Sequence, residues 1–166
     1  HEMYGTISRD KTRKAPHNAM VDLAMVKELY NYDPQPRKFV FDPDTPFEGE
    51  EISHITIPFD MGSARTEYNY DADQGLYLRK QGGKPFRDAN TNEQVAVKNI
   101  SVEITADHPL PGTQKADVIG EGDALFFIDG KMKKGKWKKD AILEATQYTY
   151  EDGSEVVLRP GKTWIH

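Results

Sequence analysis

The chain has 166 residues, 30% of them charged, and a formal net charge of −5. This length suits one domain of ordinary size rather than two, and the acidic balance disfavours nucleic acid or an anionic membrane as a partner of the whole molecule. The absence of cysteine excludes disulfide bonds, a thiolate metal site and a cysteine nucleophile. No run of about 18 apolar residues occurs, so no transmembrane helix is predicted.

The N-terminal part predicts a single helix. Residues 1–17 are polar and mixed, and Asn18 is a suitable N-cap for a helix that runs through Tyr30. Apolar side chains cover most of the circumference of this segment, so we expect the helix to be buried against a sheet. The next stretch, residues 31–50, holds four prolines and predicts an extended connector around a short strand at Phe39–Phe41.

From Ile52 onward the pattern is that of short β-strands, because turn signals recur about every 8–12 residues. A change of phase between Val97 and Ile100 predicts a bulge between them. The pattern predicts a β-rich α+β fold, an antiparallel sandwich or barrel-like sheet with one buried N-terminal helix, as a single domain over residues 18–166. The expected strands cover residues 55–59, 65–70, 75–80, 94–105, 123–128, 131–138, 145–150, 155–158 and 163–165.

An Asp129-Gly130 pair marks the clearest hairpin in the sequence. It joins an apolar run, Ala124 to Ile128, to six lysines within residues 131–139. Such a pair between two strand-like runs is a strong hairpin signal, because both central residues of a tight type I′ turn need positive φ.

The lysines of this hairpin form the first candidate binding site. Strand alternation places Lys134, Lys136 and Lys138 on one face and Trp137 on the other. Three ammonium groups in a row can contact the spaced phosphates of an anionic cell-wall polymer or of lipid headgroups. The alternative is a solvated face whose lysines prevent edge-to-edge pairing of sheets, which is the commoner structure.

Aromatic and charged residues on two neighbouring hairpins form the second candidate site. Aromatic faces and guanidinium groups suit a groove for a glycan or a peptide, and Asp88 beside Arg79 would add a carboxylate for an enzyme. The alternative is ordinary cross-strand pairing within a sheet. The residues of this second group are Tyr68, Tyr70, Tyr77, Arg79, Arg87 and Asp88.

No catalytic residues, metal site or cofactor are predicted. The stretch Asp71-x-Asp73-x-Gly75 lacks the glycine and glutamate positions of a calcium loop and predicts a plain turn. His17, His54 and His108 stand alone, without the spacing of zinc ligands. Gly120-x-Gly122 lacks the third glycine and the following helix of a dinucleotide site.

A series of short motifs follows in a fixed order along the second part of the chain. They are Tyr68-x-Tyr70-Asp71, Gly75-x-Tyr77-x-Arg79, Asp88-x-x-Thr91, Asn99-Ile100, Gly120-x-Gly122-x-Ala124, Asp129-Gly130-Lys131, Gly135-x-Trp137-Lys138 and Leu158-x-Pro160-Gly161-x-Thr163-Trp164-Ile165. From about Ile52 to the end, this series resembles the C-terminal domain of the YerB-like bacterial lipoproteins. The ordered series is specific for that family, whereas a single motif is not.

The resemblance implies a cellular address and no reaction. It implies an extracytoplasmic protein of a Gram-positive bacterium, tethered by a lipidated cysteine upstream, from a family whose function is unknown. Arg9-Asp10 and Pro16-His17-Asn18 resemble the segment that leaves the family's N-terminal domain, so we interpret residues 1–17 as that segment and the chain as a fragment. Where the family has a polar residue or a histidine before Asp88, this chain has Phe86-Arg87, which weakens a catalytic site there.

These observations lead to three functional hypotheses. The first is a non-catalytic interaction domain outside the cytoplasm, whose partner is a protein or an anionic cell-wall polymer and whose only membrane contact is a lipid anchor outside this chain. The second is an enzyme that acts on the glycan or peptide of the cell envelope. The third is a structural domain that packs against the missing N-terminal domain, which an exposed apolar patch around residues 18–30 would favour. Nucleic acid is not an expected partner.

Overall fold

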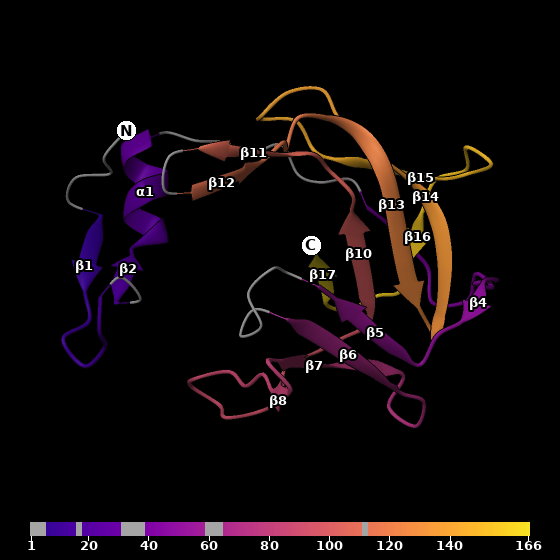
Figure 1. Cartoon of the computed structure of the whole chain (residues 1–166), viewed down its shortest axis with the longest axis horizontal. Coiled ribbons are helices and arrows are strands. Elements are labelled where there is room, and N and C mark those ends of the chain that lie inside the picture. Colours follow the sequence, from indigo (N-terminus) through magenta and orange to yellow (C-terminus); the bar gives the residue numbers. More distant parts are fainter. Residues whose placement is uncertain (1–5, 16–17, 31–38, 59–64, 111–112) are drawn as a thin grey trace. The chain divides into compact units, whose positions relative to one another are not determined.

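The computed structural model describes residues 6–15, 18–30, 39–58, 65–110 and 113–166 (Figure 1). The chain divides into two compact units, His1–Pro36 and Arg37–His166. Short strands dominate and one short helix accompanies them, so the predicted β-rich α+β class is confirmed. The boundary expected at residues 17 and 18 lies inside the first unit, and the predicted domain division itself stays a prediction.

The first unit is a small hairpin followed by a helix. Strand β1 (Ile7–Arg9) pairs antiparallel with β2 (Ala19–Val21), and helix α1 spans Leu23–Tyr30. No helix in the described part of the chain is long and apolar enough to cross a membrane.

The helix prediction was wrong at its start and in its burial. Asp22, rather than Asn18, caps α1, because the Asp22 carboxylate accepts a hydrogen bond from the Met25 amide at 3.1 Å. The Asn18 side chain instead accepts a hydrogen bond from Arg9 across the hairpin, at 2.9 Å. The helix is not buried either, since Leu23 is 72% exposed.

The second unit contains two main sheets (Figure 1). The six-stranded sheet has the order β15-β14-β13-β10-β17, with β4 added to β14, and every pair is antiparallel except β10 and β17. The five-stranded sheet has the order β5-β6-β7-β8, with β9 added to β7. The strands of the first sheet are β4 (Glu50–Glu51), β10 (Asn99–Glu103), β13 (Gly120–Ile128), β14 (Lys131–Lys139), β15 (Gln147–Tyr150) and β17 (Thr163–Ile165). Those of the second are β5 (His54–Ile57), β6 (Thr66–Asp71), β7 (Leu76–Gln81), β8 (Lys84–Pro85) and β9 (Ala96–Val97).

Two smaller pairs complete the second unit. Strands β3 (Val40–Phe41) and β16 (Val157–Leu158) pair in parallel. Strands β11 (Asp107–Leu110) and β12 (Thr113–Ala116) form a hairpin that the sequence did not predict, because the prolines of this region are typical of a loop.

The six-stranded sheet carries a hydrophobic core on each face. Phe126 packs with Trp137 in one core, and its neighbour Phe127 packs with Tyr77 and Ile100 in the other. Successive residues of a strand point to opposite faces, so both faces of β13 are buried along this stretch. The five-stranded sheet covers the second core, which makes the arrangement a sandwich, as predicted.

The Asp129-Gly130 turn joins the two sheets. Both residues have positive φ, 52° and 75°, so the predicted hairpin turn is confirmed. The Gly130 amide donates to the hydroxyl of Tyr77 in β7 at 2.9 Å, and the Gly130 carbonyl accepts from the Ile52 amide at 2.8 Å. A Cβ atom at Gly130 would lie 2.6 Å from the ring of Tyr70, so only glycine fits there. The turn is therefore fixed by its contacts with the second sheet.

Asn99 ties β10 to the loop that leads into β17. Its side chain is fully buried. The side-chain NH₂ group donates to the Arg159 carbonyl at 2.9 Å and to the Thr163 hydroxyl at 3.1 Å. The side-chain oxygen accepts a hydrogen bond from the Arg159 amide at 2.8 Å. These bonds satisfy the buried amide and set the register in which Asn99 pairs with Thr163.

We expect Tyr77→Phe to lower the free energy of unfolding by about 1–3 kcal/mol, because the buried Gly130 amide then loses its acceptor. Urea denaturation measures the change. Tyr70→Phe is the matched control, since it keeps the ring against Gly130 and should change stability by only about 0.5 kcal/mol. Equal effects of the two substitutions would contradict the importance of the Tyr77 hydroxyl.

Candidate functional site

The tyrosines and Arg79 of the second predicted site belong to the core. Tyr68 and Tyr77 are fully buried and Arg79 is 6% exposed, whereas Tyr70 is half-buried. Tyr68 pairs with Arg79 across β6 and β7, and Tyr70 pairs with Tyr77. The expectation that Tyr68, Tyr77 and Arg79 line a groove is therefore wrong, because the sandwich covers these three side chains and cross-strand pairing accounts for their placement.

Arg79 lies between two aromatic rings. Its guanidinium carbon is 3.9 Å from the ring centre of Phe86 and 4.4 Å from that of Trp164, and Nη2 donates to the Thr66 hydroxyl at 3.3 Å. The Nε and Nη1 atoms are buried and make no hydrogen bond within the described part of the chain. Cation–π contact with two aromatic rings offsets part of the cost of burying the charge. Arg79 thus joins β7 to β17 inside the protein.

Tyr68 and His166 form a neutral pair beside this arginine. The Tyr68 hydroxyl lies 2.9 Å from Nε2 of His166. Burial, followed by the charge of Arg79, lowers the pKa of His166 to about 4. Burial also raises the pKa of Tyr68 to about 12. Both side chains are therefore uncharged near neutral pH.

Arg87 and Asp88 belong to an exposed turn. The Asp88 carboxylate accepts hydrogen bonds from the amides of Asn90 and Thr91, each at 2.9 Å, and these bonds lower its pKa. The Arg87 guanidinium donates to the carbonyl of Asn92 at 2.7 Å. Both side chains hold the turn together, and the structure does not bring them into one open site with the buried tyrosines.

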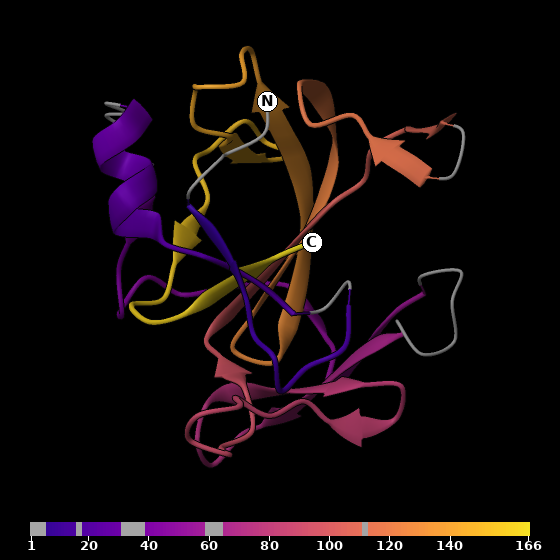
Figure 2. The same cartoon turned by 90° about the vertical axis from the view of Figure 1, so that its left-hand side faces the viewer.

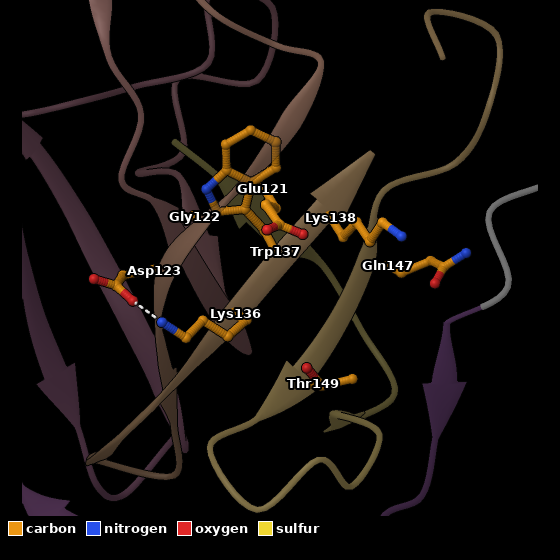
Figure 3. Close-up of a pocket in the computed structure, with 8 residues that line it drawn as sticks. All are labelled: Glu121, Gly122, Asp123, Lys136, Trp137, Lys138, Gln147 and Thr149. Atoms are coloured by element: carbon orange, nitrogen blue, oxygen red, sulfur yellow. Dashed lines mark hydrogen bonds and ion pairs between the residues drawn. The ribbon is translucent and has the colours of Figure 1, made fainter. Parts of the chain in front are cut away.

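Two of the three predicted lysines, Lys136 and Lys138, line an open hollow on the six-stranded sheet (Figure 3). Lys134, Lys136 and Lys138 are exposed on one face of β14 and Trp137 is buried on the other, so the predicted alternation is confirmed. The hollow has a volume of about 560 Å³. It is lined by Glu121, Gly122, Asp123, Lys136, Trp137, Lys138, Gln147 and Thr149.

The hollow is open because the second sheet covers only part of this face. Leu125 and Phe127 of β13 pack towards the five-stranded sheet, and Asp123, which points the same way by strand alternation, is exposed. Figure 2 shows the long orange strands β13 and β14 extending past the magenta sheet. The uncovered end of the strands therefore exposes a rigid, regular surface.

Trp137 supports the hollow from beneath. Its indole nitrogen donates to the Ile104 carbonyl at 3.0 Å. A Cβ atom at Gly122 would lie only 2.7 Å from that nitrogen, so the glycine allows β13 to approach the ring. The hollow consequently rests on a packed layer.

Lysines in and beside the hollow form ion pairs with nearby carboxylates. Lys136 lies 2.5 Å from Asp123, and Lys138 lies 3.3 Å from Asp140. The hydrogen bond and charge of Lys136 lower the pKa of Asp123, and Asp123 raises the pKa of Lys136 in return. Lys134 has no ion-pair partner among the described residues.

The acidic and neutral residues of the hollow were missed by the sequence analysis. A two-residue turn at Asp129-Gly130 fixes the pairing of the strands on either side, so counting outward places Asp123 opposite Lys136 and Glu121 opposite Lys138. This signal was available in the sequence. Gln147 and Thr149 carried no such signal, because they belong to a separate strand.

The described residues contain no group of three or more histidine, aspartate or glutamate side chains that could hold a metal ion. The stretch Asp71-x-Asp73-x-Gly75 is a turn, in which the Asp71 carboxylate accepts from the Gln74 amide at 3.0 Å. His17 lies outside the described residues.

A family model described as the C-terminal domain of a protein of unknown function (DUF3048) matches residues 55–165. The chain belongs to this family. The crystal structure of the YerB protein from Bacillus subtilis is similar, with a TM-score of 0.73 at 24% sequence identity, over 96% of this chain and 55% of that chain. This likeness concerns the fold alone, and the chain spans about half the length of YerB. The resemblance to the YerB-like family is thus confirmed, and no curated protein matches the chain.

We expect this YerB-like domain to lose stability between about pH 6.5 and pH 4. In this range an unfolded chain protonates His166, whose ordinary pKa is about 6.5, whereas the folded chain does not until about pH 4. The free energy of unfolding therefore decreases as the pH is lowered through this window. The expected decrease is about 1–2 kcal/mol after allowance for the partial exposure of His166. Urea denaturation at several pH values measures it.

His166→Gln supplies the comparison for this pH dependence. The variant lacks the titrating ring, so its stability should fall less over the same pH window than that of the parent. Equal falls in the two proteins, or an NMR titration of His166 near pH 6.5, would show that the ring is not held neutral.

Proposed function

We propose that this chain is a non-catalytic interaction domain of a membrane-tethered protein on the outer side of a bacterial cytoplasmic membrane. The hollow on β13, β14 and β15 binds its partner, which is a protein or a cell-wall polymer. The observation that carries the proposal is the hollow itself: a volume of about 560 Å³ built on regular strands and lined by charged and polar side chains. Small-molecule sites of proteins are usually concave and carry a few well-placed polar groups, so a concave surface of this kind is a candidate binding site.

The charges of the hollow favour binding over catalysis. General acid–base catalysis needs a group whose pKa lies near the working pH. The pKa of Asp123 is lowered and that of Lys136 is raised, so each group stays in its charged form. Such groups recognise charge but do not readily exchange protons.

The structure does not contain the arrangement of residues on which the enzyme hypothesis depended. The hypothesis required Arg79, Asp88 and the tyrosines to meet in one open site. Arg79 is buried between Phe86 and Trp164, and the Asp88 carboxylate caps its own turn. Neither the hollow on β13, β14 and β15 nor the smaller one beside Phe47 and Tyr150 is lined by these residues.

The extracytoplasmic address rests on the YerB-like family resemblance. In that family's lipoproteins a lipidated cysteine tethers the protein to the membrane of a Gram-positive bacterium. The hollow would then face the wall and its polymers, or the outer domains of neighbouring membrane proteins.

The proposal predicts binding that depends on the lysines of the hollow. Isothermal titration against purified wall polymers and a pull-down from a membrane extract test the two partner classes. Lys136→Gln with Lys138→Gln should weaken binding roughly threefold or more, because two exposed charge contacts are lost. Lys84→Gln with Lys162→Gln removes the same charge from exposed positions outside the hollow and should bind as the parent does.

Two results would contradict this proposal. The first is the absence of binding in both assays. The second is an equal loss of binding in the two double variants, which would assign the effect to net charge rather than to the hollow.

A second candidate function is structural, and one observation favours it. The first unit leaves large apolar side chains exposed, with Leu23 at 72%, Leu29 at 58% and Met20 at 54%. Exposed apolar side chains gathered on one small unit are typical of an interaction surface. In this function the unit packs against another domain of a longer protein.

The structural function predicts an effect that appears only in the longer protein. Leu23→Ser with Leu29→Ser should lower the free energy of unfolding of a protein with an upstream domain by about 2 kcal/mol or more, because buried leucines are lost. The same change in the present chain should have little effect, since these side chains are exposed. Leu143→Ser, at a position 61% exposed in the second unit, is the control. Equal effects in both proteins would contradict this function.

A further inference from the structure

The charges of the hollow lie in columns along the strands (Figure 3). Strand β13 contributes Glu121 and Asp123, and β14 contributes Lys138 and Lys136 as their direct cross-strand partners. Neighbouring strands lie about 4.8 Å apart. An acidic column and a basic column therefore run side by side across the surface.

Strand β15 adds a third, uncharged column. Gln147 pairs with Lys138, and Thr149 pairs with Lys136. Lys134 extends the basic column beyond the hollow, and it has no ion-pair partner among the described residues. Within the hollow, the basic column thus has acidic residues on one side and the uncharged Gln147 and Thr149 on the other. Glu151, directly after β15, adds a further acidic charge near Lys136.

This pattern does not suit a uniform polyanion. The two acids and two lysines that line the hollow carry no net charge together. A chain of phosphates along the lysines would lie about one strand spacing from Glu121 and Asp123 and be repelled by them. The phosphates would also compete with Asp123 for Lys136, because the Lys136 ammonium already lies 2.5 Å from the Asp123 carboxylate.

The pattern also disfavours sugar stacking and strand addition. Trp137, the aromatic residue of the hollow, is 2% exposed and offers no ring face to a sugar. The outer edge of β15 is already occupied, because the Tyr150 amide donates to the Ser154 carbonyl at 2.8 Å and the Val156 amide donates to the Tyr148 carbonyl at 3.3 Å. A partner must therefore lie across the face of the sheet.

We infer that the partner of the hollow is a polypeptide surface with two complementary columns of charge, basic residues opposite Glu121 and Asp123 and acidic residues opposite Lys134, Lys136 and Lys138. This inference rests on the proposed function and names the chemical class of its partner. Complementary charges across an interface fix its register and exclude wrong partners. The column pattern makes both signs of charge necessary for binding.

The decisive measurement is the sign of the effect when the acids are removed. Glu121→Gln with Asp123→Asn keeps the lysines and raises the net charge of the hollow. A two-column partner should then bind roughly threefold or more weakly, whereas a polyanion should bind more tightly. Lys136→Gln with Lys138→Gln should lower the affinity for both kinds of partner, so it shows how large a loss the assay reports when lysines of the hollow are removed.

Three defined probes make the test independent of the natural partner. The first is a synthetic β-hairpin peptide with lysines along one strand and glutamates along the other, on the same face. The second is the same hairpin with glutamates on both strands, and the third is inorganic polyphosphate. NMR titration of the complete chain measures each affinity and shows whether the shifts fall on β13, β14 and β15.

We expect the mixed hairpin to bind most tightly and to lose affinity in both double variants. Two results overturn the inference. One is that the parent binds the glutamate hairpin or polyphosphate more tightly than the mixed hairpin; the other is that Glu121→Gln with Asp123→Asn gains affinity for the mixed hairpin.

The same measurements separate the inference from the proposed function. If wall polymer binds through Lys136 and Lys138 while the mixed hairpin does not bind, the proposed function stands and the inference fails. If no probe, polymer or extract binds, both fail. Urea denaturation of each variant confirms that it is folded.

Discussion

The docking of the Asp129-Gly130 turn onto β7 is the contact on which the second unit depends. Asp129 accepts a hydrogen bond from Arg159 at 2.7 Å, and Gly130 bonds to Tyr77 on one side and Ile52 on the other. One tight turn thereby connects the six-stranded sheet, the five-stranded sheet and the segment before β17. The Asp129 carboxylate and both backbone polar groups of the buried Gly130 have partners, so the position of the turn is set within narrow limits.

The position of that turn also determines where the hollow lies. Strands β13 and β14 are nine residues long each and start from the turn in fixed register. Near the turn, their shared face meets the second sheet through Phe127; at the far end, the same face carries Asp123 and is open. Because a strand alternates strictly between its two faces, a shift of one residue would bury the charges and expose the core.

Features encoded locally were predicted from the sequence. The Asp-Gly turn and the alternation of Trp137 with the lysines depend on a few adjacent residues, and both are present. The family was also predicted, because its motifs occur in a fixed order. The candidate site was predicted only on its lysine side, although the register of the turn already placed Asp123 there.

Features that depend on distant contacts were not predicted. Whether Tyr68 lines a groove or fills a core depends on which sheet packs over it, and a strand pattern does not show this. Residues 19–21 have the composition of a helix but pair with Ile7–Arg9, a partner that no local signal indicates. Tertiary pairing overrides local preference at such positions.

The three hydrogen bonds of Asn99 constrain the order in which the chain can fold. The amide of Asn99 finds its partners in Arg159 and Thr163, about 60 residues later in the chain. During synthesis, the centre of the six-stranded sheet stays incomplete until almost all of the second unit has been made. Long-range pairing of this kind slows folding and leaves unpaired strand edges exposed meanwhile. The centre of the six-stranded sheet is therefore among the last parts of the second unit that can close during synthesis.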